Sequence, residues 1–361
     1  MSILEHTLKA AMMRGGTSKG LFVLKAHLPA RWEDQEKLLL TMMNPLTGLG
    51  GDKPTSNKIA IIDKYVDGRI ADVSYLSGQV KPGKIDTTLS CGNTLAAVGP
   101  FAIQEGLLVA THPETRVRIF CENTGVIVHS IVQTPNCQLS YEGETQVDGV
   151  PGKWAAIKLN YLNAVGAKTG KLLPTGRPQD ILDGIRISWV DVAVPTLFIH
   201  ADDLGLKGNE DISVLGSVSF LTRLEEIRQK AALLAGLERD EAAMRISIVS
   251  PAGNVGAVTS RCFTTAPLTV HSAHPVQVAL SLTAACYIPG KVAAEVATLP
   301  SYGDCFMIEH PQGVIGTSIS LEKDSEGGLI GIPEVGIVTT ANAIMRGEFT
   351  MPFTRIKKTE Q

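Results

Sequence analysis

Two segments of this sequence are apolar on nearly every side of a helix and consist mainly of small residues. They are "CGNTLAAVGPFAIQEGLL" (91–108) and "HPVQVALSLTAACYI" (274–288). A helix that is hydrophobic all round is usually buried, and small side chains allow strands to close tightly about it. We therefore predict two central helices, each surrounded by sheet. Pro100 is expected to kink or shorten the first of them.

Runs rich in β-branched residues dominate the rest of the chain and predict strands. They cover residues 20–24, 58–63, 72–80, 115–121, 125–132, 155–162, 185–200 and 244–250. Amphipathic helices are expected over 33–44 and 217–237. With 35 glycines and 5% aromatic residues, the composition is typical of a turn-rich α/β or α+β enzyme.

The two apolar segments indicate an internal repeat. "ENTGVIV" (122–128) follows the first segment, and "EHPQGVI" (309–315) follows the second at a similar distance. The match is weak, so a chance similarity stays open as an alternative. A domain boundary is expected near "LPTGRPQDILDG" (173–184), because that stretch is rich in proline and glycine.

Charge and cysteine content exclude several classes of protein. The formal net charge is −3 and no basic stripe with aromatics appears, so we expect no nucleic-acid partner. The N-terminus lacks the pattern of a secretory signal, and the apolar stretch 276–290 is too short to span a bilayer. Six cysteines without a CxxC pair favour reduced thiols in the cytoplasm. No GxSxG, and no GxGxxG after a strand, supports a hydrolase or a dinucleotide-binding enzyme.

"MRGGTSKG" (13–20) is glycine-rich but does not have the spacing of a phosphate-binding P-loop, GxxxxGK[ST]. A Gly-Gly turn exposes backbone N–H groups, and the next three side chains add donors. Such a nest suits an anion, a carboxylate included. Candidate binding residues here are Gly16, Thr17, Ser18 and Lys19, and an ordinary glycine-rich hairpin is an equal alternative.

Lys58 opens a strongly apolar strand after a second glycine-rich stretch, "GLGGDKPTSNKIAII" (48–62). A lysine in this position either extends its ammonium group into solvent or is partly desolvated. Desolvation disfavours the ammonium form, lowers its pKa and makes a usable base. The local sequence by itself favours the solvent-facing lysine.

Cys91 stands where the first apolar helix begins, followed by Gly92, Asn93 and Thr94. A helix N-terminus presents unpaired N–H groups and a positive partial charge, which stabilise a thiolate and bind a nearby anion. The alternative is a buried structural cysteine. The position at the helix start favours function, whereas the other five cysteines are expected to pack.

"HSAH" (271–274) precedes the second apolar helix. Two histidines three residues apart can share a metal, but no carboxylate or cysteine ligand lies nearby and HExxH is absent. Capping of the helix or contact with a substrate, by Ser272 and His274, is expected instead. We predict no metal and no cofactor.

With these motifs in this order, the chain resembles the PrpF family of methylaconitate and oxalomesaconate isomerases and tautomerases, which are similar in fold to diaminopimelate epimerase. "MRGGTSKG", "GLGG…TSNK", "YLSGQV" (75–80), "CGNTLAAVGPFAIQEGLL" and "FIHADDLGLKGNE" (198–210) carry the resemblance. It implies an α+β, diaminopimelate epimerase-like fold with two pseudo-symmetric domains, each a mixed sheet rolled around a central helix. The domains would be 1–184 and 185–347, with 348–361 as a segment that could return to the first.

The resemblance also implies a cofactor-independent isomerase that acts on a small unsaturated di- or tricarboxylate, such as methylaconitate, aconitate or oxalomesaconate. It would move a C=C bond by allylic proton transfer, or isomerise it cis–trans, in a cleft between the domains. Lys58 and Cys91 match the proton-transfer residues by position. The expected substrate-binding set is Gly16, Thr17, Ser18, Lys19, Ser56, Asn57, Gln79, Gly92, Asn93, Thr94, Ser272 and His274.

The sequence departs from the family pattern in three places. "TTAN" (339–342) stands where many members have an RTAR-like run, Val194-Pro195 replaces an Asn-Pro, and Asn57 replaces a serine. Loss of arginine removes a bidentate carboxylate partner, so the substrate can differ from the best-known ones.

Two rival functions stay open. One is an amino-acid epimerase or racemase on the same fold, and the other is a non-catalytic carboxylate-binding accessory protein. The oligomeric state, a homodimer or larger homo-oligomer included, is also open.

Overall fold

The computed structural model describes residues 4–88, 90–237, 244–264, 268–301 and 305–353, and the chain divides into two compact units. Unit 1 comprises residues 1–157 and 339–361, and unit 2 comprises residues 158–338. Residues 158–184, which we expected in the first domain, belong to unit 2. One reason is that β9 (Asp180–Leu182) pairs with β10 (Ile185–Val192). A second is that the Asp191 carboxylate accepts the backbone N–H groups of Lys168 and Thr169.

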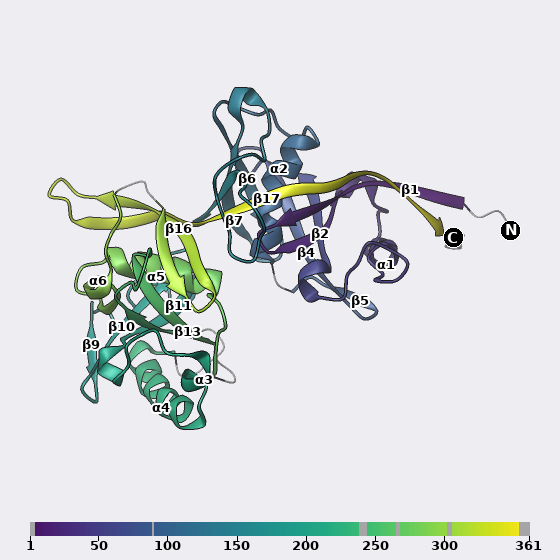
Figure 1. Cartoon of the computed structure of the whole chain (residues 1–361). Coiled ribbons are helices and arrows are strands. Elements are labelled where there is room, and N and C mark those ends of the chain that lie inside the picture. Colours follow the sequence, from purple (N-terminus) through teal and green to yellow (C-terminus); the bar gives the residue numbers. More distant parts are fainter. Residues whose placement is uncertain (1–3, 89, 238–243, 265–267, 302–304, 354–361) are drawn as a thin grey trace. The chain divides into compact units, whose positions relative to one another are not determined.

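Unit 1 is built on a mixed sheet, and several of its strands are labelled in Figure 1. From β1 to β7, successive neighbours pair antiparallel, parallel, antiparallel, parallel and antiparallel. The strands are β1 (Leu4–Gly15), β2 (Ser18–Leu24), β3 (Lys58–Lys64), β4 (Val73–Lys81), β6 (Glu114–Cys121) and β7 (Val126–Gln133). Short β5 (Lys84–Asp86) pairs with β4.

Unit 2 repeats this arrangement. From β10 to β16 the same five relations recur in the same order. The strands after β10 are β11 (Val194–His200), β12 (Arg245–Ser250), β13 (Val258–Thr264), β15 (Phe306–His310) and β16 (Gly313–Lys323). The β6–β7 and β15–β16 turns, which hold the two similar segments of sequence, occupy corresponding places. The internal repeat is therefore confirmed.

The last strand, β17 (Leu329–Phe353), belongs to both units. Its first part pairs with β16, and its second part pairs with β1 from Gly15↔Ala341 to Leu4↔Phe353. Residues 348–353 of the segment expected to return to the first domain lie in this ladder, and 354–361 lie outside the described residues. The remaining elements are β8 (Ala156–Leu162), β14 (Thr269–Val270), α3 (Ile212–Leu215), α6 (Val292–Val296), and the 3-10 turns η1 (Lys25–His27), η2 (Pro54–Ser56), η3 (Pro135–Cys137) and η4 (Asp202–Leu204).

Each sheet has a buried apolar helix against one face, as predicted. In unit 1, α2 (Gly92–Gln104) contacts β1, β2, β3, β4, β6 and β7, and Thr94 to Ala102 are buried. In unit 2, α5 (Val276–Tyr287) contacts β10, β11, β12 and β16. Pro100 does not interrupt α2, which ends at Gln104 rather than at 108.

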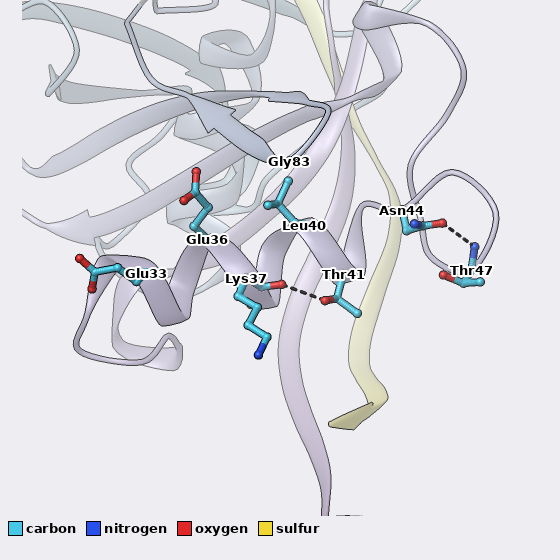
Figure 2. A pocket seen from close by; sticks show the side chains of 8 residues that line it. All are labelled: Glu33, Glu36, Lys37, Leu40, Thr41, Asn44, Thr47 and Gly83. Atoms are coloured by element: carbon cyan, nitrogen blue, oxygen red, sulfur yellow. Dashed lines mark hydrogen bonds between the residues drawn. The ribbon is translucent and has the colours of Figure 1, made fainter. Parts of the chain in front are cut away.

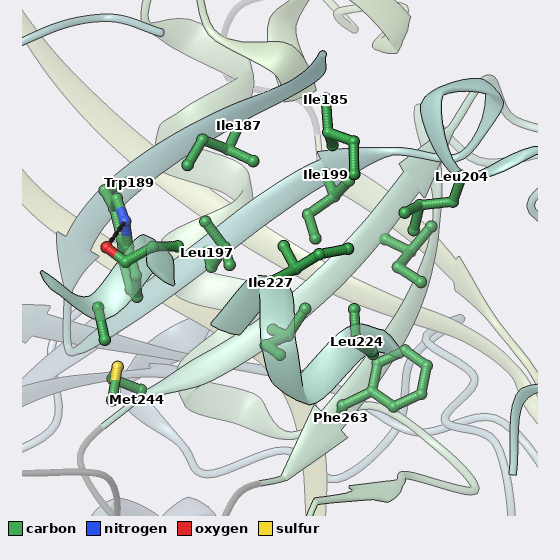
Figure 3. Packing of buried hydrophobic residues seen from close by; sticks show 14 of the residues in the cluster. Ile185, Ile187, Trp189, Leu197, Ile199, Leu204, Leu224, Ile227, Met244 and Phe263 are labelled. Carbon is green, nitrogen blue, oxygen red and sulfur yellow. Dashed lines mark hydrogen bonds between the residues drawn. The ribbon is translucent and has the colours of Figure 1, made fainter. Parts of the chain in front are cut away.

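The opposite face of each sheet packs against an amphipathic helix. In unit 1 this is α1 (Trp32–Met42), whose Leu38, Leu39 and Met42 join one apolar cluster. In unit 2 it is α4 (Val218–Ala235), which packs on β10–β13 (Figure 3). There the Trp189 indole N–H donates to the Ala231 carbonyl at 3.1 Å. The two helices follow β2 and β11 and so match each other in the repeat.

Candidate active site

Lys58 is the first residue of β3, and its side chain lies on the face of the sheet that packs against α2. Its cross-strand neighbour is Gln79, and the next pairs along this face are Ala60 with Ser77 and Ile62 with Tyr75. Side chains of paired residues, and of residues two apart, share a face. Phe22, which pairs with Ala60 on this face, packs its ring 5.7 Å from Phe101 of α2.

Cys91 is the N-cap of α2 and is half-buried. The Cys91 side chain makes no capping hydrogen bond, and the N–H groups in the first turn of a helix, here Gly92 and Asn93, have no partner within the helix. The Cys91 N–H donates to the Ser77 hydroxyl at 3.2 Å. The predicted position of the thiol at the start of a buried helix is confirmed.

Lys58 and Cys91 therefore lie close together within unit 1. Ser77, which bonds to the Cys91 backbone, is two residues from Gln79, the neighbour of Lys58. Two residues of a strand span about 7 Å. Lys58 is half-buried, and a Cβ added at Gly20 of β2 would lie 2.9 Å from the Lys58 Cβ, so glycine leaves room beside it.

"MRGGTSKG" forms the β1–β2 hairpin, and its tip lies against the first turn of α2. Gly15 pairs with Ser18, and Gly16 has a φ of +49°. The Asn93 amide N–H donates to the Thr17 hydroxyl at 3.2 Å. A Cβ added at Gly15 would lie 2.1 Å from the Asn93 carbonyl oxygen, so only glycine permits this contact. Ser18 is buried and Lys19 is exposed.

Arg14 fastens this hairpin to β17. Its Nη1 donates to the carbonyls of Gly16 (3.1 Å) and Thr340 (3.0 Å), and its Nε donates to the Asn342 side-chain oxygen (2.6 Å). The guanidinium lies over the Trp154 ring, with its carbon 5.0 Å from the ring centroid. The segment "TTAN" (339–342) thus lies beside the hairpin. The Asn342 side chain orients Arg14, and the backbone carbonyl of Thr340 accepts the Gly16 N–H at 2.8 Å.

Ser56 and Asn57 fold the loop that leads into β3. The Ser56 hydroxyl donates to the Lys53 carbonyl at 2.9 Å. The side-chain amide of Asn57 accepts the Gly51 N–H through its oxygen and donates to the Gly51 carbonyl through its nitrogen. The backbone carbonyl of Asn57 accepts from the Gln79 side-chain amide at 3.0 Å. These contacts fix the position of Lys58. Substrate contact by Ser56, Asn57 and Gln79 stays a prediction.

Ser272 and His274 lie in unit 2, just before α5. Ser272 is exposed, whereas His274 is buried and engaged at both ring nitrogens. Nδ1 lies 3.1 Å from the Pro275 carbonyl, which can only accept, so Nδ1 carries the proton. Nε2 then accepts from Ser260 (3.0 Å) or Cys262 (3.2 Å). Substrate contact by His274 is untested, but its side chain already has protein partners.

Burial keeps the polar groups beside α5 uncharged. It lowers the pKa of His274 to about 3 and raises the pKa of Cys262 to about 12. Both groups are neutral near pH 7 and are poorly suited to proton transfer there.

The predicted site does not coincide with the surface hollow of about 460 Å³ in Figure 2. That hollow is lined by Glu33, Glu36 and Lys37 of α1 and by Gly83 of the β4–β5 turn, and it contains none of the predicted site residues. In the part of the chain that the structure describes, no cluster of three His, Cys, Asp or Glu side chains could hold a metal. No helix there is long and apolar enough to cross a membrane.

Sequence reasoning did not single out Tyr75 and Ser77, although both contribute to the site. Tyr75 is fully buried and reaches the start of α2, where its hydroxyl lies 2.6 Å from the Thr94 hydroxyl. The signal was present in "YLSGQ", because residues two apart in a strand share the face of Gln79. Arg14 and Asn342 were also missed, since only the folded chain brings β17 beside β1.

Comparisons with known proteins agree with this geometry. A sequence model described as PrpF protein matches residues 6–352. The (4E)-oxalomesaconate Delta-isomerase of Novosphingobium sp. (strain KA1) is 37% identical over 93% of this chain and 95% of its own length. The 3-methylitaconate isomerase of Eubacterium barkeri is 32% identical over 95% of this chain and 97% of its own length.

Among solved structures, the crystal structure of a methylitaconate-delta-isomerase matches with a TM-score of 0.85 and 31% identity over 96% of both chains. The fold and these relatives define the chain as an isomerase with an α+β fold. It belongs to the PrpF family.

Proposed function

We propose that this isomerase moves a C=C bond within a small unsaturated di- or tricarboxylate by allylic proton transfer. The relatives support this substrate class, because their names include oxalomesaconate and 3-methylitaconate. The observation that carries the proposal is the placement of Lys58 and Cys91 on one side of a single sheet, linked through Gln79 and Ser77.

Lys58 and Cys91 are the proposed proton-transfer pair. One group removes a proton from the carbon at one end of the allylic system, and the electron pair moves toward the conjugated carboxylate or keto oxygen. The other group then delivers a proton to the carbon at the opposite end, so that the double bond shifts and no atom is gained or lost. Because both groups hold and release protons themselves, the step needs no cofactor.

The start of α2 and the hairpin are the proposed carboxylate cradle. The N–H groups of Gly92 and Asn93 point out of the helix end, and the Asn93 and Thr17 side chains lie beside them. N–H donors fixed in this way stabilise the negative charge that develops on a substrate oxygen. Thr94 is fully buried, and its hydroxyl is engaged with Tyr75 and the Cys91 carbonyl.

The geometry at α5 argues against the epimerase alternative. An epimerase with two acid–base groups needs a second proton carrier, and the position that corresponds to Cys91 is Pro275, the N-cap of α5. Its neighbours His274 and Cys262 are buried, and their pKa values lie near 3 and 12.

We also propose reduced thiols as the working state, as in the cytoplasm, since all six cysteines are free.

The test is proton NMR in deuterated water with trans-aconitate, 2-methylaconitate, oxalomesaconate and 3-methylitaconate as separate substrates. We expect deuterium to enter with migration of the double bond in at least one of them. Deuterium exchange at an sp3 stereocentre of an amino acid, without migration, would establish an epimerase instead. If no acid of a broad panel reacts, the catalytic proposal is wrong.

Variants of the proposed pair test the assignment of residues. Cys91→Ser and Lys58→Met are each expected to lower turnover about a hundredfold or more. Lys64→Met is the matched control, because Lys64 is the exposed last residue of the same strand. Cys137→Ser, which replaces an exposed cysteine of the same unit, is the matched control for Cys91→Ser. Near-normal turnover in Cys91→Ser or Lys58→Met removes that residue from the mechanism.

A further inference from the structure

We propose that Tyr75 is a positioning residue for Cys91, acting with Thr94 on the Cys91 carbonyl while Ser77 holds the Cys91 N–H. We call this set of hydrogen bonds the Cys91 circuit. The proposal deepens the proposed function and rests on it, because it takes Cys91 as a proton-transfer group. The circuit begins at the Cys91 backbone N–H and ends at the Cys91 carbonyl oxygen, so it holds this residue from both sides.

All three hydroxyl-bearing residues of the circuit lie in the interior of unit 1. Tyr75, Ser77 and Thr94 are exposed by 0%, 1% and 0% respectively. Tyr75 and Ser77 stand two residues apart on the face of β4 that packs against α2, and Thr94 is in the first turn of α2. A buried hydroxyl left without a partner costs free energy, so these groups need each other.

The direction of each hydrogen bond follows from the two ends. The Cys91 N–H can only donate, and it donates to the Ser77 hydroxyl at 3.2 Å. The Cys91 carbonyl can only accept, and the Thr94 hydroxyl donates to it at 3.1 Å. The Thr94 oxygen therefore accepts from the Tyr75 hydroxyl at 2.6 Å, and hydrogen bonds in such a chain strengthen one another.

Tyr75 keeps its proton in this circuit. Burial raises its pKa, and the nearby Cys91 raises it further. The phenol is therefore a permanent donor and takes no part as an acid or base near pH 7. Its hydroxyl also lies 3.3 Å from the Cys91 carbonyl, a second and weaker route to the same atom.

Unit 2 holds its central helix by a corresponding but different set of contacts. The carbonyl of Pro275, the N-cap of α5, lies 3.1 Å from His274 Nδ1, and the His274 ring in turn contacts Ser260 of β13. Ser260 lies 2.9 Å from Ser247 of β12. In both halves the carbonyl of the N-cap residue is thus held by a hydrogen bond. Pro275 has no N–H, so the second hydrogen bond, from the N-cap N–H to the sheet, belongs to unit 1, where the N-cap residue is Cys91.

The consequence for the reaction is geometric. With its N–H and its carbonyl both fixed, Cys91 presents its thiol at the end of α2 from a constant backbone position. A displacement of about 1 Å in a reacting group can cost two orders of magnitude in rate. Loss of the Tyr75 hydroxyl removes the hydrogen bonds to Thr94 and to the Cys91 carbonyl, while the ring still fills its place in the core.

The experiment compares Tyr75→Phe with the unaltered protein in two measurements. The first is steady-state turnover, where we expect kcat to fall about tenfold to a hundredfold with KM within about twofold. The second is the rate of Cys91 alkylation by iodoacetamide at one fixed pH, resolved by peptide mass spectrometry. We expect the rate constant for Cys91 to fall by about threefold or more, since the thiol moves away from the helix end. Cys137, in the same sample, is the internal control and keeps its rate constant.

Ser247→Ala is the matched control variant, because it breaks the corresponding chain of contacts in unit 2 and leaves the Cys91 circuit intact. We expect unchanged kcat and an unchanged Cys91 alkylation rate. If Tyr75→Phe does not fold, Thr94→Val removes the hydroxyl between Tyr75 and the Cys91 carbonyl and takes the same measurements.

Three outcomes overturn the proposal: unchanged kcat and alkylation rate, a lower kcat with an unchanged Cys91 alkylation rate, or a raised KM with kcat retained. Failure of the proposed function is seen separately, as normal turnover in Cys91→Ser. The alkylation rate does not depend on turnover, so it reports the position of the thiol in either case.

Discussion

Arg14 carries a positive charge into a half-buried place between β1 and β17, and no ion pair with a carboxylate is recorded for it among the described residues. Instead it donates to the carbonyls of Gly16 and Thr340 and to Asn342, and it lies over Trp154. Burial lowers its pKa. This residue fixes the tip of the hairpin on which the proposed carboxylate cradle depends.

Replacing Arg14 by methionine is expected to lower the free energy of unfolding by about 2–3 kcal/mol, because buried carbonyl groups lose their donor. Urea unfolding followed by circular dichroism measures the change. Arg346→Met is the matched control on the same ladder: Arg346 forms a partly exposed ion pair with Glu105, and its loss should cost less than about 1 kcal/mol. Equal losses in the two variants would contradict the role given to Arg14.

Gly15 is a position where one methyl group should disturb the site. Alanine there would place its Cβ 2.1 Å from the Asn93 carbonyl, so the hairpin and α2 must move apart. We expect Gly15→Ala to lower the free energy of unfolding by about 2–3 kcal/mol and to reduce turnover. In Gly68→Ala the new Cβ meets nothing within 4 Å, and stability should not change. A Gly15→Ala protein with normal unfolding and turnover would refute the close contact.

The sequence revealed Cys91, Lys58 and the Gly15–Gly16 turn, because each stands at a visible change of pattern: a helix start, a strand start, a glycine pair. Tyr75 did not stand out, since an aromatic residue in an apolar strand looks like any core residue until its hydroxyl partners are placed. Thr94 and His274 show the converse. Both were predicted to bind substrate, and both have buried side chains engaged with other protein groups.

At the scale of elements, the sequence predicted the buried helices, most strands of unit 1 and, in unit 2, β8, β10, β11 and β12. It did not separate β10 from β11, because the apolar run 185–200 continues through Ala193, whose φ of +65° turns the chain. Strands β1, β5, β9, β13, β14, β15, β16 and β17 were not predicted. The composition of β17 gives little local signal, and pairing with distant β1 stabilises its second part.

The buried imidazole before α5 makes the stability of unit 2 depend on pH. The pKa of His274 is about 3 in the folded chain, and about 6.5 is usual for an unfolded one. Between these values the unfolded chain binds more protons, so the free energy of unfolding falls as pH decreases below about 6.5. From pH 7 to pH 5 we expect a loss of about 2 kcal/mol from this group.

Urea unfolding between pH 5 and 7 measures this slope, in a window above the usual pKa values of carboxylates. His274→Asn should flatten the slope whatever its effect on stability at pH 7. His27→Asn, which changes an exposed histidine, should retain it. The same slope in His274→Asn as in the unaltered protein would mean that another group titrates.

At the scale of the whole molecule, the same topology occurs twice, and one strand, β17, belongs to both halves. The sequence predicted the repeat from two short segments. It placed the boundary at a proline-rich stretch that the structure assigns to unit 2, because β9 within that stretch pairs with β10 and the Ser188 hydroxyl donates to the Pro178 carbonyl. Composition marks a turn in the chain, but it does not say which sheet the turn packs against.

A chain that ends at Val338 should have a weakened unit 1. It lacks the part of β17 that pairs with β1 from Leu4 to Gly15. We expect the backbone amides of β1 to exchange with deuterium about tenfold faster or more, while those of β10 keep their protection. A chain that ends at Phe353 keeps all of β17 and is the matched control. Equal exchange of β1 in both chains would contradict this assignment.

The shared strand also bears on the order in which the protein is made. Residues 1–157 leave the ribosome first, yet their sheet lacks its β1 partner until residues 341–353 have been synthesised. The second half is translated later than residues 1–157, but all of its own strands, within residues 158–338, are synthesised before residue 341. Domains commonly fold as units during synthesis, the N-terminal one first. In this protein the half that carries Lys58 and Cys91 begins first, but its sheet is completed only after that of the second half, once residues 341–353 have been synthesised.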